Sequence, residues 1–148
     1  REERNTEGGR DVVRPNPSLE RIVGRLRDAG IRVSLFIEPD AAAIEASARL
    51  QADIVELHTG TYCERALDSD AAGIAREVRR IEDAARLAHS AGLEVHAGHG
   101  LTYATVGAVA RLPEMAELNI GHYIVGEAIF GGLAESVGRM RMLMNEAR

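Results

Sequence analysis

The hydrophobic and polar residues of this chain follow two alternating patterns. Four short runs are rich in β-branched and other apolar residues, which is typical of strands buried in a sheet. Between them lie longer segments whose apolar residues recur every three or four positions, as in helices with one buried face. The predicted strands span 31–37, 52–57, 93–97 and 117–120.

The predicted helices carry start and stop signals in the sequence. Asn16 is a good N-cap, Pro17 suits the first helical position and Gly30 is a natural stop, so a helix is expected before the first strand. Thr102 is predicted to cap a later helix, which Pro113 ends. The other predicted helices span 39–50, 70–91, a short stretch that ends near 130, and 133–144.

Strands that alternate with helices predict a parallel sheet, because each crossover returns the chain to the same end of the sheet. We therefore expect the four strands to be parallel and adjacent in chain order, in a sheet buried on both faces. Four such units make half of a (β/α)8 TIM barrel, and a short extra helix after the last strand binds phosphate in many of these barrels. A doubly wound open sheet of five or fewer strands is the alternative.

Two glycine–histidine turns are the strongest candidates for chemistry. Gly98-His99-Gly100 and Gly121-His122 each follow a strand and precede a helical segment. Free backbone N–H groups and a helix start can bind a phosphate or carboxylate there, and His99 can transfer protons near neutral pH. The alternative is that His99 only satisfies strand-end carbonyls and that His122 only shapes its turn.

Composition narrows the range of functions. The net charge of −5 argues against a non-specific nucleic-acid surface, and no apolar run approaches the ~20 residues of a membrane helix. All 18 basic residues are arginine, so this segment supplies no Schiff-base lysine. The single cysteine, Cys63, fits a reducing compartment, and we expect a cytoplasmic protein. Because the chain opens with Arg1 in a charged loop, we expect it to begin partway through a longer protein.

Five motifs, in order, resemble the pyridoxine 5′-phosphate synthase family of vitamin B6 biosynthesis. They are NTEGG (5–9), VSLFIE (33–38), VELHTG (55–60), HAGHGLTY (96–103) and ELNIGH (117–122). The resemblance implies a single (β/α)8 barrel domain whose C-terminal half is residues 1–148, with 1–15 as a substrate-closing loop. It also implies a homo-octamer that needs no metal or organic cofactor.

The resemblance further implies the reaction and its catalytic residues. The family condenses 1-deoxy-D-xylulose 5-phosphate with 3-amino-2-oxopropyl phosphate to give pyridoxine 5′-phosphate, phosphate and water. The amine belongs to the substrate, which agrees with a segment without lysine. By the family pattern His99 is the proton donor and Glu56 stabilises the transition state. A structural ion pair with an arginine is the alternative role for Glu56, since an ionised carboxylate in an apolar strand is costly unless it is paired.

The remaining site residues implied by the resemblance bind substrate. Thr6 contacts the deoxyxylulose phosphate from the loop, Gly100 offers its backbone, and Gly121 with His122 holds a phosphate. One departure is Asn5, which stands where threonine is common. Two other readings stay open: a different phosphate-binding barrel enzyme, such as an isomerase or aldolase, and a non-catalytic half-barrel that only binds phosphate. We expect the 148 residues alone to be inactive.

Overall fold

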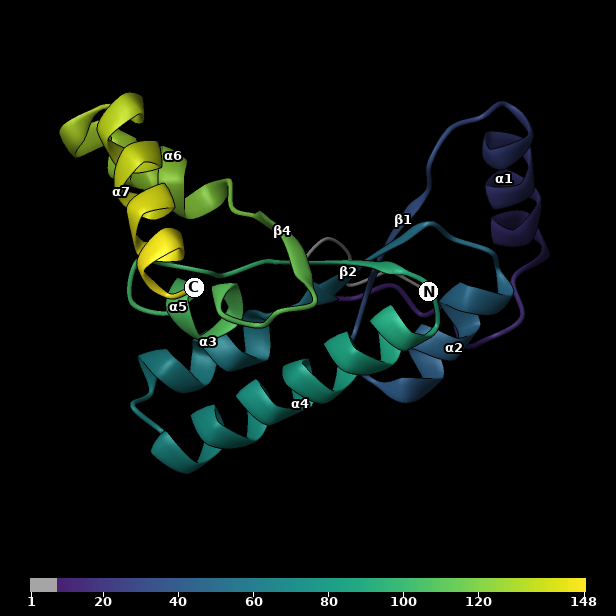
Figure 1. Cartoon of the computed structure of the whole chain (residues 1–148), viewed down its shortest axis with the longest axis horizontal. Coiled ribbons are helices and arrows are strands. Elements are labelled where there is room, and N and C mark those ends of the chain that lie inside the picture. Colours follow the sequence, from purple (N-terminus) through teal and green to yellow (C-terminus); the bar gives the residue numbers. More distant parts are fainter. Residues whose placement is uncertain (1–7) are drawn as a thin grey trace.

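A computed structural model describes residues 8–148, so Asn5 and Thr6 lie outside the described residues. The described chain alternates strands and helices, as the sequence predicts (Figure 1). The strands are β1 (Ser34–Ile37), β2 (Ile54–His58), β3 (Glu94–Gly98) and β4 (Met115–Asn119). The helices are α1 (Pro17–Asp28), α2 (Ala41–Arg49), α3 (Gly60–Leu67), α4 (Ala71–Ser90), α5 (Val106–Ala110), α6 (His122–Gly131) and α7 (Leu133–Glu146).

The four strands form one sheet in the order β1-β2-β3-β4, and every neighbouring pair is parallel. This confirms the predicted adjacency and direction of the strands. Figure 1 shows α2, α3, α4 and α5 on the same side of the strands, with α1 at one end and the α6–α7 pair at the other. All four strands therefore place their carboxyl ends, where loops lead into helices, along one edge of the sheet.

The register of the strands separates an apolar face from a polar face. Toward the helices, the rows Leu35–Val55–Val95–Met115 and Ile37–Leu57–Ala97–Leu118 are aligned across the sheet and pack into the hydrophobic core. On the opposite face one row consists of Phe36, Glu56, His96 and Glu117. The expectation of strands that are apolar on both faces is therefore wrong, because period-two alternation puts charged residues on the second face.

The helices are fixed by side-chain caps and by apolar residues that contact the sheet. Asn16, Asp40 and Asp70 each accept a hydrogen bond from the backbone N–H three residues later, at 3.0, 2.8 and 2.9 Å. Such caps are worth about 1 kcal/mol each. Ile44 of α2 and Ile81 of α4 are fully buried against the strands, and each contributes about 1.5–3 kcal/mol by leaving water.

Two helices differ from the sequence-based expectation. α3 was not predicted, because Gly60–Leu67 begins with glycine and buries only Gly60, Tyr62 and Cys63. α5 begins at Val106 rather than after Thr102, because the Thr105 hydroxyl accepts the Thr102 N–H at 2.9 Å and closes a turn there. The predicted cap at Thr102 is therefore wrong.

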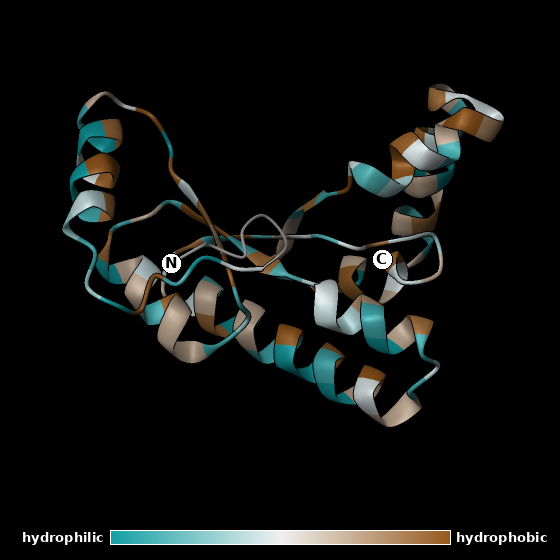
Figure 2. Cartoon of the chain, turned by 180° about the vertical axis from the view of Figure 1, so that it is seen from behind, coloured by the Kyte–Doolittle hydropathy of each residue, from teal (hydrophilic) through white to brown (hydrophobic). Residues whose placement is uncertain are grey.

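The last two helices form a pair that is joined by Gly132, whose φ of +85° lets the chain reverse direction. The short apolar helix expected after the last strand is thus confirmed as α6. Within the described part of the chain α6 has no buried residue, and Ile129 and Phe130 are 81% and 88% exposed. Figure 2 shows hydrophobic colour at the outer end of the α6–α7 pair. Among residues 8–148, no helix has both the length and the apolar character needed for a membrane span.

Candidate functional site

A cavity of about 580 Å³ lies where β2, β3 and β4 end. Five of the six predicted site residues line it: Glu56, His99, Gly100, Gly121 and His122. The sixth, Thr6, lies outside the described residues. The parallel order of the strands explains the convergence, because residues that follow neighbouring strands meet at the same edge of a sheet. The two glycine–histidine turns, 22 residues apart in sequence between His99 and Gly121, therefore share one site.

The turn after β3 has an unusual backbone. His99 has φ +79° and Gly100 has φ +82°, so two successive residues are left-handed. A residue with a Cβ rarely adopts such a φ, and doing so costs on the order of 1–2 kcal/mol. The geometry turns the His99 side chain out of the strand direction at the edge of the cavity. Gly100 avoids the same strain because it has no side chain.

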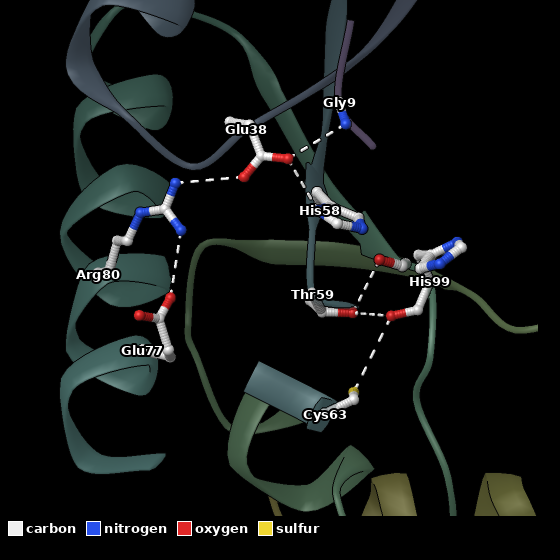
Figure 3. Close-up of polar contacts among 9 residues, drawn as sticks. Gly9, Glu38, His58, Thr59, Cys63, Glu77, Arg80 and His99 are labelled. Atoms are coloured by element: carbon white, nitrogen blue, oxygen red, sulfur yellow. Dashed lines mark hydrogen bonds and ion pairs between the residues drawn. The ribbon is translucent and has the colours of Figure 1, made fainter. Parts of the chain in front are cut away.

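The strained backbone at His99 is held by Thr59, which precedes α3, and by Cys63 within α3. This helix was not predicted from the sequence. The buried Thr59 hydroxyl lies 2.7 Å from the Gly98 carbonyl oxygen and 2.6 Å from that of His99 (Figure 3). The Thr59 N–H also donates to Gly98, at 2.9 Å. Cys63 approaches the His99 carbonyl at 3.9 Å, and burial raises the pKa of its thiol, which keeps the sulfur protonated and unreactive.

A second histidine, His58, stands beside His99 and was not singled out from the sequence as a site residue. The two ring centroids are 4.9 Å apart, and the Phe36 ring meets His58 edge-on at 5.3 Å. The His58 side chain is only 9% exposed, and its Nδ1 lies 2.8 Å from Glu38 Oε1. This contact joins the end of β2 to the residue after β1. In the sequence, the two residues appear only as members of the neighbouring motifs VSLFIE and VELHTG.

Glu38 is the centre of a polar network that joins three parts of the chain (Figure 3). It contacts His58, accepts the Gly9 N–H at 3.1 Å and receives Arg80 from α4 at 3.2 Å. The contact with His58 is the largest cause that lowers the pKa of Glu38 to about 2, and the Gly9 and Arg80 donors act in the same direction against partial burial. Glu38 is therefore ionised at neutral pH.

Glu56 lies on the polar face of β2, and its partner comes from β4. The Asn119 side-chain amide donates to Glu56 Oε2 at 2.8 Å. No arginine forms an ion pair with Glu56 among residues 8–148, so the structural-pair alternative has no support there. The carboxylate lines the cavity and is half-buried, which leaves it able to interact with a cationic group.

The second turn provides the start of α6. Gly121 is the residue before the helix, its carbonyl accepts the Val125 N–H at 3.0 Å, and His122 is the first helical residue and is exposed. A Cβ added at Gly121 would meet no described atom within 4 Å. The open space above Gly121, together with the positive end of a ten-residue helix, suits an anion.

His96, whose direction was left open by the sequence, lies on the polar side of the sheet, level with Glu56. Its Nε2 lies 2.7 Å from Glu94 Oε1 and its Nδ1 4.0 Å from Glu117 Oε1. His96 does not line the cavity. In the described residues no three His, Cys, Asp or Glu side chains are arranged to hold a metal ion.

Residues 1–146 match the sequence model of the family described as "Pyridoxal phosphate biosynthesis protein PdxJ". The chain belongs to this PdxJ family. It is 55% identical over 148 residues to pyridoxine 5′-phosphate synthase of Rhodopseudomonas palustris (strain HaA2) and 55% identical to that of Caulobacter sp. (strain K31). The enzyme of the same name from Ruegeria pomeroyi is 51% identical. The resemblance drawn from the five motifs is therefore confirmed at the level of the family.

Each alignment with these PdxJ relatives covers 100% of this chain. It covers 58%, 59% and 60% of the three relatives, respectively. The chain thus spans somewhat more than half the length of the curated relatives that it matches.

Proposed function

We propose that the complete protein containing this chain is a pyridoxine 5′-phosphate synthase that condenses 1-deoxy-D-xylulose 5-phosphate with 3-amino-2-oxopropyl phosphate. The products are pyridoxine 5′-phosphate, inorganic phosphate and water. The observation that carries the proposal is that two glycine–histidine turns, at His99 and at Gly121, line one cavity together with Glu56. Membership of the PdxJ family and relatives named pyridoxine 5′-phosphate synthase support it.

In this proposal His99 is the proton donor and Glu56 stabilises charge in the transition state. Both side chains line the cavity, and His99 has glycine on each side, so substrate can approach closely. Glu56 is oriented by Asn119 and suits a cationic nitrogen, such as a protonated amine or imine of the substrate. The substrate brings the amine, because the chain contains no lysine.

The proposed binding residues provide backbone donors rather than charge. Gly100 and Gly121 offer N–H groups at turns, and His122 begins α6, whose positive end favours a phosphate. Thr6 is proposed to contact the deoxyxylulose phosphate from the loop of residues 1–15, which closes over substrate. The Gly9 contact with Glu38 supports this role, because it attaches the middle of the loop beside His58.

We further propose that the four parallel strands form the second half of a (β/α)8 barrel in the complete protein. The division of the sheet into an apolar face toward the helices and a polar face on the other side supports this, since barrel interiors hold the functional side chains. The exposed apolar residues of α6 and α7 support coverage by further protein. By resemblance to the family, the assembly is a cytoplasmic homo-octamer that works without a metal or organic cofactor.

The proposal is tested by expressing the complete protein and supplying both phosphorylated substrates. Release of pyridoxine 5′-phosphate and inorganic phosphate in equal amounts is the expected result, detected by chromatography and a phosphate assay. Omission of either substrate should abolish both signals. Conversion of a single substrate without condensation would contradict the proposal and favour an isomerase or aldolase, and binding of phosphate without any conversion would favour a non-catalytic half-barrel.

A further inference from the structure

Thr59 occupies the N-cap position of α3 but does not cap that helix. A threonine at this position ordinarily accepts a backbone N–H from the first turn of its own helix. Here no side-chain cap bond is formed. The hydroxyl instead lies 2.7 and 2.6 Å from the carbonyl oxygens of Gly98 and His99, 39 and 40 residues away (Figure 3). The hydroxyl thus interacts with the His99 turn, and the first turn of α3 has no side-chain cap.

The turn that receives this hydroxyl requires external support. The left-handed φ of His99, a residue with a side chain, persists only where the surrounding structure fixes it. The Thr59 side chain is completely buried, so its hydroxyl does not exchange these carbonyls for water. A single hydroxyl hydrogen serves both carbonyl oxygens, which draws the two successive peptide groups toward α3.

The direction of these carbonyls determines what the cavity receives. In a trans peptide the C=O and the following N–H point in opposite directions. Because the His99 carbonyl points to Thr59, the Gly100 N–H points away from α3. Gly100 and the His99 side chain both line the cavity. The position of one buried hydroxyl therefore sets the direction of a backbone donor and of an imidazole together.

We propose that Thr59 is a positioning residue, whose buried hydroxyl holds the left-handed His99–Gly100 turn so that the imidazole and the Gly100 N–H face the substrate. The effect on turnover rests on the proposed synthase function, whereas the effect on the turn does not. Thr59 touches no substrate in this proposal and acts only through His99 and Gly100.

The test compares Thr59→Ser with Thr59→Ala in the complete protein, because serine keeps the hydroxyl and alanine does not. Misplacement of a reacting group by about 1 Å can cost on the order of 100-fold in rate. We expect Thr59→Ala to lower kcat by roughly 10- to 100-fold, with a smaller change in KM, and Thr59→Ser to stay within about 3-fold of the unsubstituted protein. A crystal structure of each variant should show the left-handed φ at His99 retained with serine and lost with alanine.

Ser47→Ala is the matched control. Ser47 is also completely buried and donates to a carbonyl, that of Ala43 at 2.8 Å within α2, and it does not line the cavity. Its loss should lower the melting temperature without lowering kcat. Wild-type kcat in Thr59→Ala, or an unchanged turn in its crystal structure, would overturn the proposal.

Thr59→Val provides a second variant of the same shape in case alanine does not fold. If both variants fail to fold while Ser47→Ala folds, the hydroxyl serves the fold as a whole and the proposal is wrong. If the unsubstituted protein makes no pyridoxine 5′-phosphate, the synthase function fails instead. The His99 φ in the variant crystals then decides the role of Thr59 alone.

Discussion

The side chains of Glu56 and Asn119 meet across an intervening strand. Glu56 lies on β2 and Asn119 on β4, yet Asn119 Nδ2 is 2.8 Å from Glu56 Oε2. β3 separates the two, and at the position level with Asn119 it carries Gly98. A Cβ built on Gly98 would lie 2.4 Å from Glu56 Oε1 and 2.8 Å from the Asn119 carbonyl oxygen. The missing side chain of Gly98 is therefore the space in which the carboxylate and the amide interact.

Gly98→Ala in the complete protein should displace Glu56 and lower turnover by more than about 10-fold, because the new methyl group occupies the place of the carboxylate. Contact with the Asn119 backbone should also cost about 1–3 kcal/mol of unfolding free energy. Steady-state kinetics and urea denaturation measure the two effects. Gly24→Ala is the control, since a Cβ there meets no described atom and alanine stabilises a helix by about 0.5–1 kcal/mol. Normal kcat in Gly98→Ala would show that Glu56 has no catalytic role.

Substitutions at the two glycine–histidine turns should separate chemistry from binding. His99→Asn should lower kcat by about 10²–10⁴-fold, the usual contribution of a general acid, with little change in KM. Asparagine is preferable to alanine because it tolerates the left-handed backbone at this position.

Gly121→Val should have the opposite effect, raising the KM for a phosphorylated substrate more than it lowers kcat. A Cβ added there meets no described atom of the protein within 4 Å, so a rise in KM is expected to reflect the ligand. Steady-state kinetics on both variants provide the measurement. If His99→Asn raised only KM, His99 would be a binding residue rather than the proton donor.

The ionised state of Glu38 should contribute to stability at neutral pH. Its pKa is lowered from 4.5 to about 2, so the contribution is complete above pH 4.5 and is lost as the pH falls toward 2. Glu38→Gln should lower the unfolding free energy at pH 7 by about 1–2 kcal/mol, less than the full shift implies because the side chain is 36% exposed and partly screened.

Denaturant unfolding between pH 7 and pH 3 checks this prediction, and the difference between the two proteins should shrink toward acid pH. Glu45→Gln, at an exposed pair 4.0 Å from Arg49, is the control and should change stability by less than about 0.5 kcal/mol. Equal stability of Glu38→Gln and the unsubstituted protein at pH 7 would show that the network around Glu38 is energetically neutral.

The 148 residues expressed alone should lack synthase turnover. The described cavity is lined by residues at and after the ends of the four strands, and the proposed barrel needs four further strands to close. The measurement is the same two-substrate assay on the purified chain, with the complete protein as the positive control. Turnover by the 148 residues at the rate of the complete protein would contradict the proposed barrel closure.

Much of this architecture could be predicted because the hydrophobic period of each element is local. The strand around Val95 and the helix around Ile81 show their patterns within a few residues, and the cap at Asn16 is readable from its own position. The convergence of His99 and Gly121 also followed from the sequence, since parallel strands with short connections end at one edge.

The remainder depends on contacts between distant residues, which no local pattern encodes. The Glu38–His58 contact depends on the register of β1 and β2, and the Thr59 bonds span about 40 residues. α3 escaped prediction because its buried residues are few and its N-cap side chain is used elsewhere. The polar face was missed because single residues such as Glu56 and His96 interrupt otherwise apolar runs.

The polar face of the sheet, opposite the helices, restricts which protein surfaces can pack against it. Glu56, Glu94 and Glu117 project from it, and taking a carboxylate out of water is costly unless its partners compensate for the lost hydration. Arg32 offsets part of this cost at Glu94 from 2.8 Å. Packing an apolar surface against this face would cost more free energy in desolvating the carboxylates than the buried apolar area would contribute. A segment bearing cations or hydrogen-bond donors would instead bind favourably. These carboxylates, of which Glu56 also lines the cavity, thereby disfavour association of this face with apolar surfaces.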